Sequence, residues 1–431
     1  MRTQKDHVAK LLRYRWFIFW VLATAYLFVY FHRLSLSVVA NDIVKDFHTS
    51  AGIMGLLGSI YFYCYAAMQL PAGLLSDSIG PRKTVTVFLL VAAAGSVLFG
   101  MAPDIYTAFG GRILVGFGVS MVFIPTMKIL SQWFRAKEFA SMAGILNAVG
   151  GVGALAATGL LAFMTSSMGW RTSFVIIGCC TLILVILVWF VVRNRPQDLG
   201  WPSILAVENM ETASDVRAAE IELMEGVGRV LKNKHFWPVA IWFFFDCGIF
   251  FGFGALWGGP YLMHVYGLSQ GETGAVLSMI AYGMIAGSPF LGFVSDRVLK
   301  SRKKPFMICT GILTCLLLCL YLFPSELPKA ALYAVFFVLS ICASSIVVVG
   351  FTTTKELFPV EIAGTSVGTV NLFPFLGGAV FMPFLGWILD MYPKTVTGGY
   401  SLGGYKVLLL VLLISSVLAL ICTFFMKETW K

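Results

Sequence analysis

The sequence predicts an all-α integral membrane protein with twelve transmembrane helices in two pseudo-symmetric six-helix bundles. Three observations lead to this prediction: the composition, a series of long apolar runs and an internal repeat. Of the 431 residues, 58% are hydrophobic and 12% are charged, and this charged share is about half that of soluble domains. A water-soluble chain of this length could not bury so much apolar surface in one core, so lipid must solvate much of it.

The charge and the cysteines argue against other classes. The net charge is +10, but basic residues gather at the ends of apolar runs rather than in a basic stripe, so no nucleic acid partner is expected. All nine cysteines fall inside apolar runs, with no C-x-x-C pair, which predicts neither disulfides nor a metal site. Phosphate-binding loops and nucleophile triads are also missing from the sequence. We therefore expect no enzyme and no cofactor.

The predicted spans follow from the length that a helix needs to cross a bilayer, roughly 20 apolar residues. The first is read as an uncleaved span, because its apolar run is too long for a signal peptide. Residues 193–235 form a polar linker, with a surface helix expected within 216–231. The predicted organisation is an N-terminal bundle (1–192), this linker, and a C-terminal bundle (236–431). The twelve spans are expected near 16–40, 52–75, 83–102, 106–131, 139–164, 171–192, 236–264, 273–294, 305–323, 330–353, 363–390 and 404–426.

Basic residues in the loops predict the orientation of these spans. If the N-terminus is cytoplasmic, 23 of the 31 Lys and Arg residues lie on the cytoplasmic face and only 5 lie on the opposite face. Loops on the cytoplasmic side of membrane proteins are enriched in Lys and Arg. Both termini are therefore expected in the cytoplasm, and the membrane is expected to be the bacterial inner membrane.

Two short matches indicate that the halves are copies of one another. Gly73–Asp77 (GLLSD) and Gly292–Asp296 (GFVSD) each close a span, at an offset of 219 residues. Ala143–Gly144 matches Ala363–Gly364 at an offset of 220. Parallel repeats of six spans with a central site between them are a transporter architecture.

Three motifs resemble those of the major facilitator superfamily. Gly73–Lys83 (GLLSDSIGPRK) is similar to its loop signature, Gly111–Gly118 (GRILVGFG) to its fourth-helix signature, and Gly169–Phe174 (GWRTSF) to the opening of its sixth helix. Ser78 and Pro81 depart from the loop signature, in which basic residues are usual there. The fifth helix lacks the Gly-Pro pair common in drug antiporters, which argues against drug/proton antiport. The resemblance covers the whole chain and implies alternating access.

Arg33 is the main candidate for substrate binding. A charge within a span is costly and marks a functional site by default. Tyr30 and Arg33 form a Tyr-x-x-Arg pattern similar to that of organophosphate/phosphate antiporters and organic-anion symporters, in which the arginine holds the substrate anion. A planar guanidinium suits a carboxylate or a phosphate. The alternative is a pairing of Arg33 with Asp42 or with a backbone carbonyl.

Four further residues are candidates for the lining of a substrate cavity. Lys128 would make the cavity positive if it points inward, but a lysine there can equally extend to the cytoplasmic face. Asn147 and Asn371 occupy corresponding spans of the two halves and either line the cavity or hydrogen-bond across helices. Trp257 is expected to close the outer side of the pocket, although most aromatic residues around it are expected to pack or to face lipid.

Asp246 is the main candidate for proton coupling. It lies about ten residues into the seventh span, where desolvation favours the neutral form of a carboxyl group. It is expected to exchange a proton during the cycle or to bind a substrate amine, and the alternative is a permanent salt bridge between helices. His32 is a weaker candidate for coupling, because a histidine near a helix end is more often simply hydrogen-bonded. Arg112 belongs to the fourth-helix signature, and its place near the outer end favours a coupling or structural role over direct contact with the substrate.

A cytoplasmic gate is expected where the two copies of the loop signature end. Salt bridges and helix-end contacts there would break and re-form as the two halves rock. The residues assigned to this gate are Asp77, Arg82, Arg135, Asp296 and Arg302.

These observations predict a secondary active transporter for a small organic anion, such as a carboxylate or a sugar phosphate, with protons as a candidate coupling ion. The expected partners are the solute and the lipid bilayer, and one chain is expected to be the functional unit. A permease for amino acids or other nutrients remains an alternative, because the stretch 355–365 resembles bacterial nutrient permeases. A drug exporter and a non-transporting membrane sensor also remain open.

Overall fold

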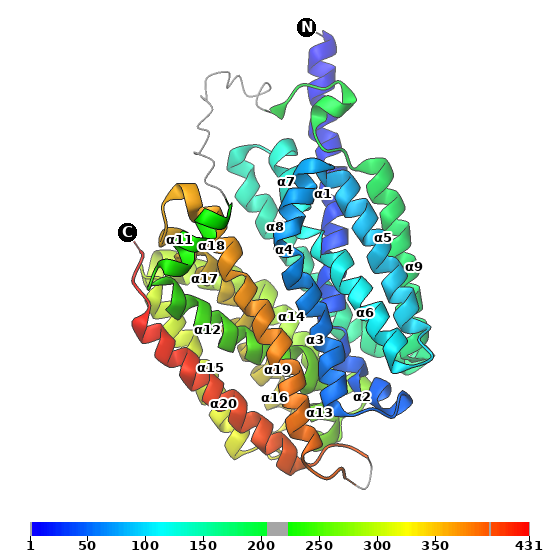
Figure 1. Cartoon of the computed structure of the whole chain (residues 1–431), viewed down its shortest axis with the longest axis vertical. Helices are drawn as coiled ribbons and strands as arrows, with labels where there is room; N and C mark the ends of the chain where they lie inside the picture. Colours follow the sequence, from blue (N-terminus) through cyan, green and yellow to red (C-terminus); the bar gives the residue numbers. More distant parts are fainter. Residues whose placement is uncertain (1, 205–222, 396–397, 431) are drawn as a thin grey trace. The chain divides into compact units, whose positions relative to one another are not determined.

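The computed structural model describes residues 2–204, 223–395 and 398–430, and throughout these ranges the regular elements are helices (Figure 1). The one exception is an isolated bridge between Lys394 and Tyr400. Backbone groups in lipid must be satisfied within the protein, and helices achieve this within one segment.

The first part of the chain forms nine helices over the described residues. They are α1 (Arg2–Leu34), α2 (Leu36–Asp46), α3 (Ala51–Ala67), α4 (Gln69–Ser78), α5 (Pro81–Gly100), α6 (Ile105–Ser120), α7 (Phe123–Trp133), α8 (Ala136–Leu155) and α9 (Leu161–Val191). A π-helical turn joins α8 to α9, and a short 3₁₀ helix follows α9.

The second part contains a short surface helix, as expected from the sequence, followed by the remaining spans. Its helices are α11 (Leu223–Lys232), α12 (Phe236–Ile249), α13 (Gly258–Tyr266), α14 (Gln270–Phe293), α15 (Lys303–Leu322), α16 (Lys329–Ser340), α17 (Val347–Glu356), α18 (Val360–Val370), α19 (Leu372–Asp390) and α20 (Leu402–Phe425). The part of the predicted linker between 205 and 222 lies outside the described residues.

The helices agree with twelve membrane-spanning segments. Ten stretches of the described chain are long and apolar enough to cross a membrane. One of them, Met142–Val191, contains 50 residues and is interrupted at Gly169, whose φ of 79° is readily adopted only by glycine. Division at this point, together with the shorter apolar helix α3, accounts for twelve. The predicted fold class is confirmed.

The boundaries differ from the prediction at the first span. Hydropathy placed it at 16–40, but α1 extends from Arg2 to Leu34. The helix is interrupted at Ser35, and α2 begins at Leu36. A helix continues beyond the apolar stretch wherever its backbone can still be paired, so hydropathy marks the part in lipid rather than the helix end.

Contacts divide the chain into two compact units. The first unit comprises Met1–His32, Cys64–Gly153 and Arg171–Arg217. Within it α5 and α6 pack closely, because a Cβ atom at Gly95 would come within 2.7 Å of the Val115 nitrogen. Small residues allow such close approach between membrane helices.

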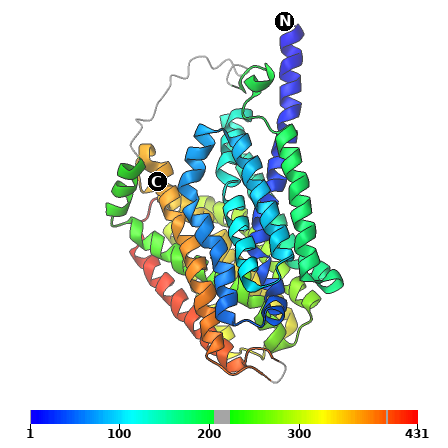
Figure 2. The same cartoon turned by 45° about the vertical axis from the view of Figure 1, so that its right-hand side comes forward.

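The second unit comprises Arg33–Tyr63, Ala154–Trp170 and Ala218–Lys431. Its core is built around α12, which packs against α19 and α20, and the latter two run side by side in orange and red in Figure 2. A π-helix of eight residues, Phe250–Trp257, continues the chain between α12 and α13.

The part of α3 up to Tyr63 also belongs to the second unit, where α19 holds the first turn of this helix. The Asp390 carboxylate accepts hydrogen bonds from the backbone amides of Ala51, at 2.8 Å, and Gly52, at 2.6 Å. A Cβ atom at Gly55 would lie 2.5 Å from the Cα of Pro383, so glycine is needed for this crossing. The division into 1–192, 193–235 and 236–431 stays a prediction.

Candidate functional site

Arg33 lies near the end of α1 and is 8% exposed. Within the second unit, its guanidinium carbon is 5.4 Å from the ring centroid of Phe375, on α19. A cation over an aromatic face is attracted by the negative potential of the ring. The guanidinium is therefore held in a partly desolvated position, which strengthens its interaction with an anion.

Asp246 is fully buried in α12, at 0% exposure. Across the described residues, neither of its carboxylate oxygens has a hydrogen-bond partner. The permanent salt bridge considered as an alternative is therefore not supported by a bonded partner. An isolated ionised carboxylate in such a place is expensive, and the neutral acid is the cheaper form.

Besides the thiol of the adjacent Cys247, two thiols interact electrostatically with Asp246. They belong to Cys309, on α15, and Cys342, in the π-helical turn Ile341–Ser345 between α16 and α17. The charge of Arg33 acts on the adjacent Cys247. In the described chain, no three or more His, Cys, Asp or Glu side chains gather as a metal site.

The first unit holds an aromatic and amide cluster between α1 and α8. The Tyr26 hydroxyl donates to Asn147 Oδ1 at 3.3 Å, and Tyr26 packs edge-on against Tyr30 at 5.4 Å. Tyr30 is half-buried and Asn147 is exposed. A Cβ atom at Gly150 would lie 2.8 Å from the Tyr30 ring. Tyr26, Tyr30 and Asn147 therefore form one packed cluster where α1 meets α8.

The remaining charged candidates of the first unit bind backbone oxygens. Lys128 donates from Nζ to the carbonyl of Ser76 at 3.0 Å, which fixes its ammonium beside α4. Arg112 is buried, and its Nη1 donates to the carbonyl oxygen of His32 at 3.3 Å. His32 is also fully buried.

The two other candidates of the second unit lie in different settings. Trp257 is fully buried, and its indole N–H donates to the carbonyl of Met382 at 2.9 Å, so its one polar atom is already used. Asn371 lies half-buried at the junction of α18 and α19. Asn371 is therefore the better placed of the two for a polar contact with a solute.

Arg302 is the centre of a charged network in the second unit. It pairs with Asp296 and with Glu356, the latter at 2.9 Å, and its guanidinium lies 4.8 Å from the Trp430 ring centroid. Its backbone amide donates to Glu428 at 2.8 Å. Burial lowers the pKa of Arg302, but hydrogen bonds from its guanidinium to Glu356 and Asp296 outweigh burial and raise the pKa. The network joins the ends of α14, α15 and α17 to the C-terminal tail.

The gate candidates of the first unit form a different arrangement. Arg82 donates from Nε to the carbonyl of Trp189 at 3.1 Å and lies 4.5 Å from the indole ring centroid. Glu138 accepts from the Arg135 amide at 3.1 Å and pairs with Arg15 at 2.8 Å. The side chain of Asp77 lies outside the described residues.

Sequence reasoning did not single out Phe375, Cys309, Cys342 or Asp390. Phe375 and the two cysteines sit in apolar runs, where hydropathy gives them no distinction from packing residues. Asp390 ends a span, and an acidic residue at a span end is ordinary. Only the folded chain brings these residues beside charged or polar groups.

The chain matches a known protein family over most of its length. A family model described as Major Facilitator Superfamily matches residues 22–258 and 247–429.

Several relatives match over most of their length. The "Probable galactarate/D-glucarate transporter GarP" of Escherichia coli (strain K12) is 23% identical over 428 residues, covering 92% of this chain and 90% of the relative. The "Glycerol-3-phosphate transporter" of Bacillus subtilis (strain 168) is 24% identical, covering 88% and 84%. The "Membrane sensor protein UhpC" of Escherichia coli (strain K12) is 24% identical, covering 88% of each.

A solved structure shows the same fold. The crystal structure of a bacterial homologue of the human lysosomal transporter Spinster, inward-facing and unoccupied, has a TM-score of 0.76. It is 17% identical in sequence, and the match covers 96% of this chain and 98% of that one.

Proposed function

The chain belongs to the Major Facilitator Superfamily, and from this premise we propose that it carries a small organic anion, such as a carboxylate or a sugar phosphate, by alternating access. It is a multi-pass membrane transporter rather than an enzyme. The observation that carries the choice of substrate is the buried Arg33 in the first span.

The relatives support an anionic substrate. One relative is named for galactarate and D-glucarate, which are dicarboxylates, and another is named for glycerol 3-phosphate. A guanidinium binds both carboxylate and phosphate through paired N–H donors. In this proposal Arg33 binds the anion, and Tyr30, Asn147, Asn371 and Lys128 contribute polar contacts.

The role of Asp246 in this proposal is to take up and release the coupling proton. Its carboxyl group is buried and has no hydrogen-bond partner in the described chain, so the neutral form is stable there. Access of water during the cycle would allow it to ionise. His32 and Arg112 are assigned a supporting part in coupling.

The proposal includes the topology. The protein lies in the inner membrane of a bacterial cell with both termini in the cytoplasm, because Lys and Arg residues are enriched in cytoplasmic loops. One chain is the transport unit. The gate of this proposal consists of Asp77, Arg82, Arg135, Asp296 and Arg302. Labelling of single cysteines placed in successive loops, with a reagent that cannot cross the membrane, tests the topology.

Uptake into proteoliposomes tests the anion site. Loss of a charged hydrogen bond costs about 1.5–3 kcal/mol, so Arg33→Ala is expected to raise KM about 10- to 100-fold. Arg33→Lys is expected to recover only part of this loss, because a lysine lacks the paired donors. Arg195→Ala is the control, since Arg195 is an exposed arginine paired with Asp198. Unchanged uptake in Arg33→Ala would exclude the anion site.

A second flux assay tests the proton site. Asp246→Asn is expected to bind the anion but to lose the acceleration that an inward proton gradient produces. Asp198→Asn, in an exposed helical turn, serves as control. Full dependence on the gradient in Asp246→Asn would contradict the role of Asp246.

A membrane sensor is the second candidate, and the similarity to the protein named as a membrane sensor favours it. Binding of the anion without any flux in proteoliposomes would support this candidate. Flux of amino acids, or of apolar cations, would support a nutrient permease or a drug exporter instead.

A further inference from the structure

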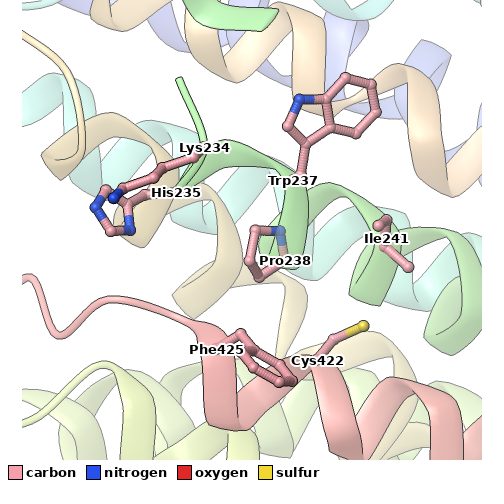
Figure 3. A pocket seen from close by; sticks show the side chains of 7 residues that line it. All are labelled: Lys234, His235, Trp237, Pro238, Ile241, Cys422 and Phe425. Carbon is pink, nitrogen blue, oxygen red and sulfur yellow. The ribbon is translucent and has the colours of Figure 1, made fainter. Parts of the chain in front are cut away.

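A groove lies between the beginning of α12 and the end of α20, within the second unit (Figure 3). Its volume is about 420 Å³. The residues that line it are Lys234, His235, Trp237, Pro238, Ile241, Cys422 and Phe425.

Most of the groove is apolar and open to the surroundings of the protein. Phe425 is 70% exposed, Trp237 is 41% exposed and Ile241 is 38% exposed. Both bordering helices belong to membrane-spanning stretches. Exposed apolar side chains on such helices face hydrocarbon, so the occupant of this part of the groove must itself be apolar.

One end of the groove is basic. Figure 3 shows the Lys234 ammonium and the His235 ring together at this end, away from Ile241 and Cys422. Over the described part of the chain, neither side chain has a hydrogen-bond or ion-pair partner of its own. A basic end without an internal counter-charge favours an anion beside an apolar body.

Trp237 marks the boundary between the two ends. Its indole N–H donates to the carbonyl of Leu231, the next-to-last residue of α11, at 3.0 Å. Tryptophan is enriched at the level of lipid headgroups, where one edge is wet and the ring is apolar. The basic residues therefore stand at headgroup depth, and the apolar wall extends toward the acyl chains.

We propose that this groove is a binding site for one anionic phospholipid of the surrounding bilayer. An acyl chain lies against Pro238, Ile241 and Phe425, and the phosphate is bound by Lys234 and His235. The complementarity of charge at one end and of apolar surface at the other identifies this occupant. Basic pockets between transmembrane helices are suited to anionic headgroups.

Lipid retention measured by native mass spectrometry tests the site. Purified protein is exchanged into detergent with phosphatidylglycerol or with phosphatidylcholine. The wild type is expected to keep one phosphatidylglycerol, and Lys234→Gln/His235→Gln is expected to lower its occupancy about tenfold, because two ligands of the phosphate are lost. Lys232→Gln is the matched control, since Lys232 is an exposed lysine at the end of α11, outside the groove.

A thermal shift assay gives an independent readout that does not depend on transport. Phosphatidylglycerol is expected to raise the melting temperature of the wild type and of Lys232→Gln, but not of the double variant. Equal retention of phosphatidylcholine, or full retention of phosphatidylglycerol in the double variant, would overturn the proposal. Stabilisation by soluble glycerol phosphate that is lost in the double variant would also overturn it, in favour of a site for free phosphates.

If the double variant does not fold, Phe425→Ala, Lys234→Gln and His235→Gln are measured separately. Each is expected to lower phosphatidylglycerol occupancy severalfold, and no change in all three would reject the site.

Discussion

The carboxylate of Asp390, at the end of α19, caps the first turn of α3 by accepting a hydrogen bond of 2.6 Å from the backbone amide of Gly52. The other carboxylate oxygen accepts the amide of Ala51. These two amides belong to the four N–H groups that a helix leaves unpaired at its start. The negative charge also interacts favourably with the positive end of the helix dipole. One side chain therefore stabilises α3 and ties it to α19.

Asp390→Ala is expected to destabilise the protein by about 0.5–2 kcal/mol, the usual cost of losing an N-cap. Amide hydrogen exchange should accelerate at residues 51–54. Asp104→Ala is the control, because Asp104 caps α6 by accepting the Thr107 amide at 2.8 Å. That variant should lose protection only at the start of α6. Unaltered exchange at residues 51–54 in Asp390→Ala would contradict the cap.

Gly55→Val should separate α3 from α19. A Cβ atom at this position would lie 2.5 Å from the Cα of Pro383, and backbone cannot move aside as a side chain can. Overpacking of this kind costs about 1–3 kcal/mol. Gly311→Ala on α15 is the control, since nothing lies within 4 Å of an added Cβ there. Thermal unfolding in detergent compares the two, and a stable Gly55→Val would refute the close crossing.

Acidification should release the C-terminal tail from Arg302. Burial raises the pKa of Glu428, but hydrogen bonds from Ser301 and from the Arg302 amide outweigh burial, so its pKa is lower than the usual 4.5. A lowered pKa stabilises the folded state above the usual value, and this contribution disappears as the pH falls through the lowered value. The protection factors of the amides at 426–430, which correct for the intrinsic pH dependence of exchange, should fall below about pH 4.5. Glu428→Gln should show fast exchange already at pH 7, and equal protection at both pH values in the wild type would contradict this.

Asp246→Val should stabilise the protein while it abolishes the proton coupling that we propose for Asp246. The buried carboxyl group has no hydrogen-bond partner among the described residues, and such a group costs about 1–3 kcal/mol. A valine of similar volume removes that cost, so the melting temperature should rise. Asp296→Val is the contrast, because it removes one of the two acidic partners of Arg302 and should lower the melting temperature. A fall in melting temperature for Asp246→Val would show that the carboxyl group is satisfied.

The spans could be predicted because lipid imposes one requirement on every crossing helix, an apolar stretch of about 20 residues. Arg33 and Asp246 stood out for the same reason, since a charge is rare in such a stretch. Their surroundings could not be predicted. Phe375 lies beneath Arg33 only because α19 packs there, and hydropathy does not record which apolar residue becomes a neighbour.

The Asp390 cap could not be predicted from the sequence either. Gly52 and Asp390 are 338 residues apart, and an acidic residue at a span end has no local signal for a distant helix start. The π-helical stretch Phe250–Trp257 was also missed, because no apolar pattern distinguishes it from an α-helix. Gly169 was part of a recognised motif, but its positive φ became evident only in the folded chain.

The π-helix Phe250–Trp257 allows the segment from α12 to α13 to change its length. A π turn holds more residues than an α turn over a similar rise, so tightening those turns would lengthen the segment and rotate Asp246 relative to Trp257. Such a change exchanges one set of backbone hydrogen bonds for another and needs no break in the helix. Trp257 is hydrogen-bonded to the carbonyl of Met382 through its indole N–H. The rotation would therefore displace mainly the carboxyl group of Asp246. A change from π to α turns in Phe250–Trp257 would thus rotate Asp246 about the helix axis, while the hydrogen bond to Met382 holds the Trp257 end in place.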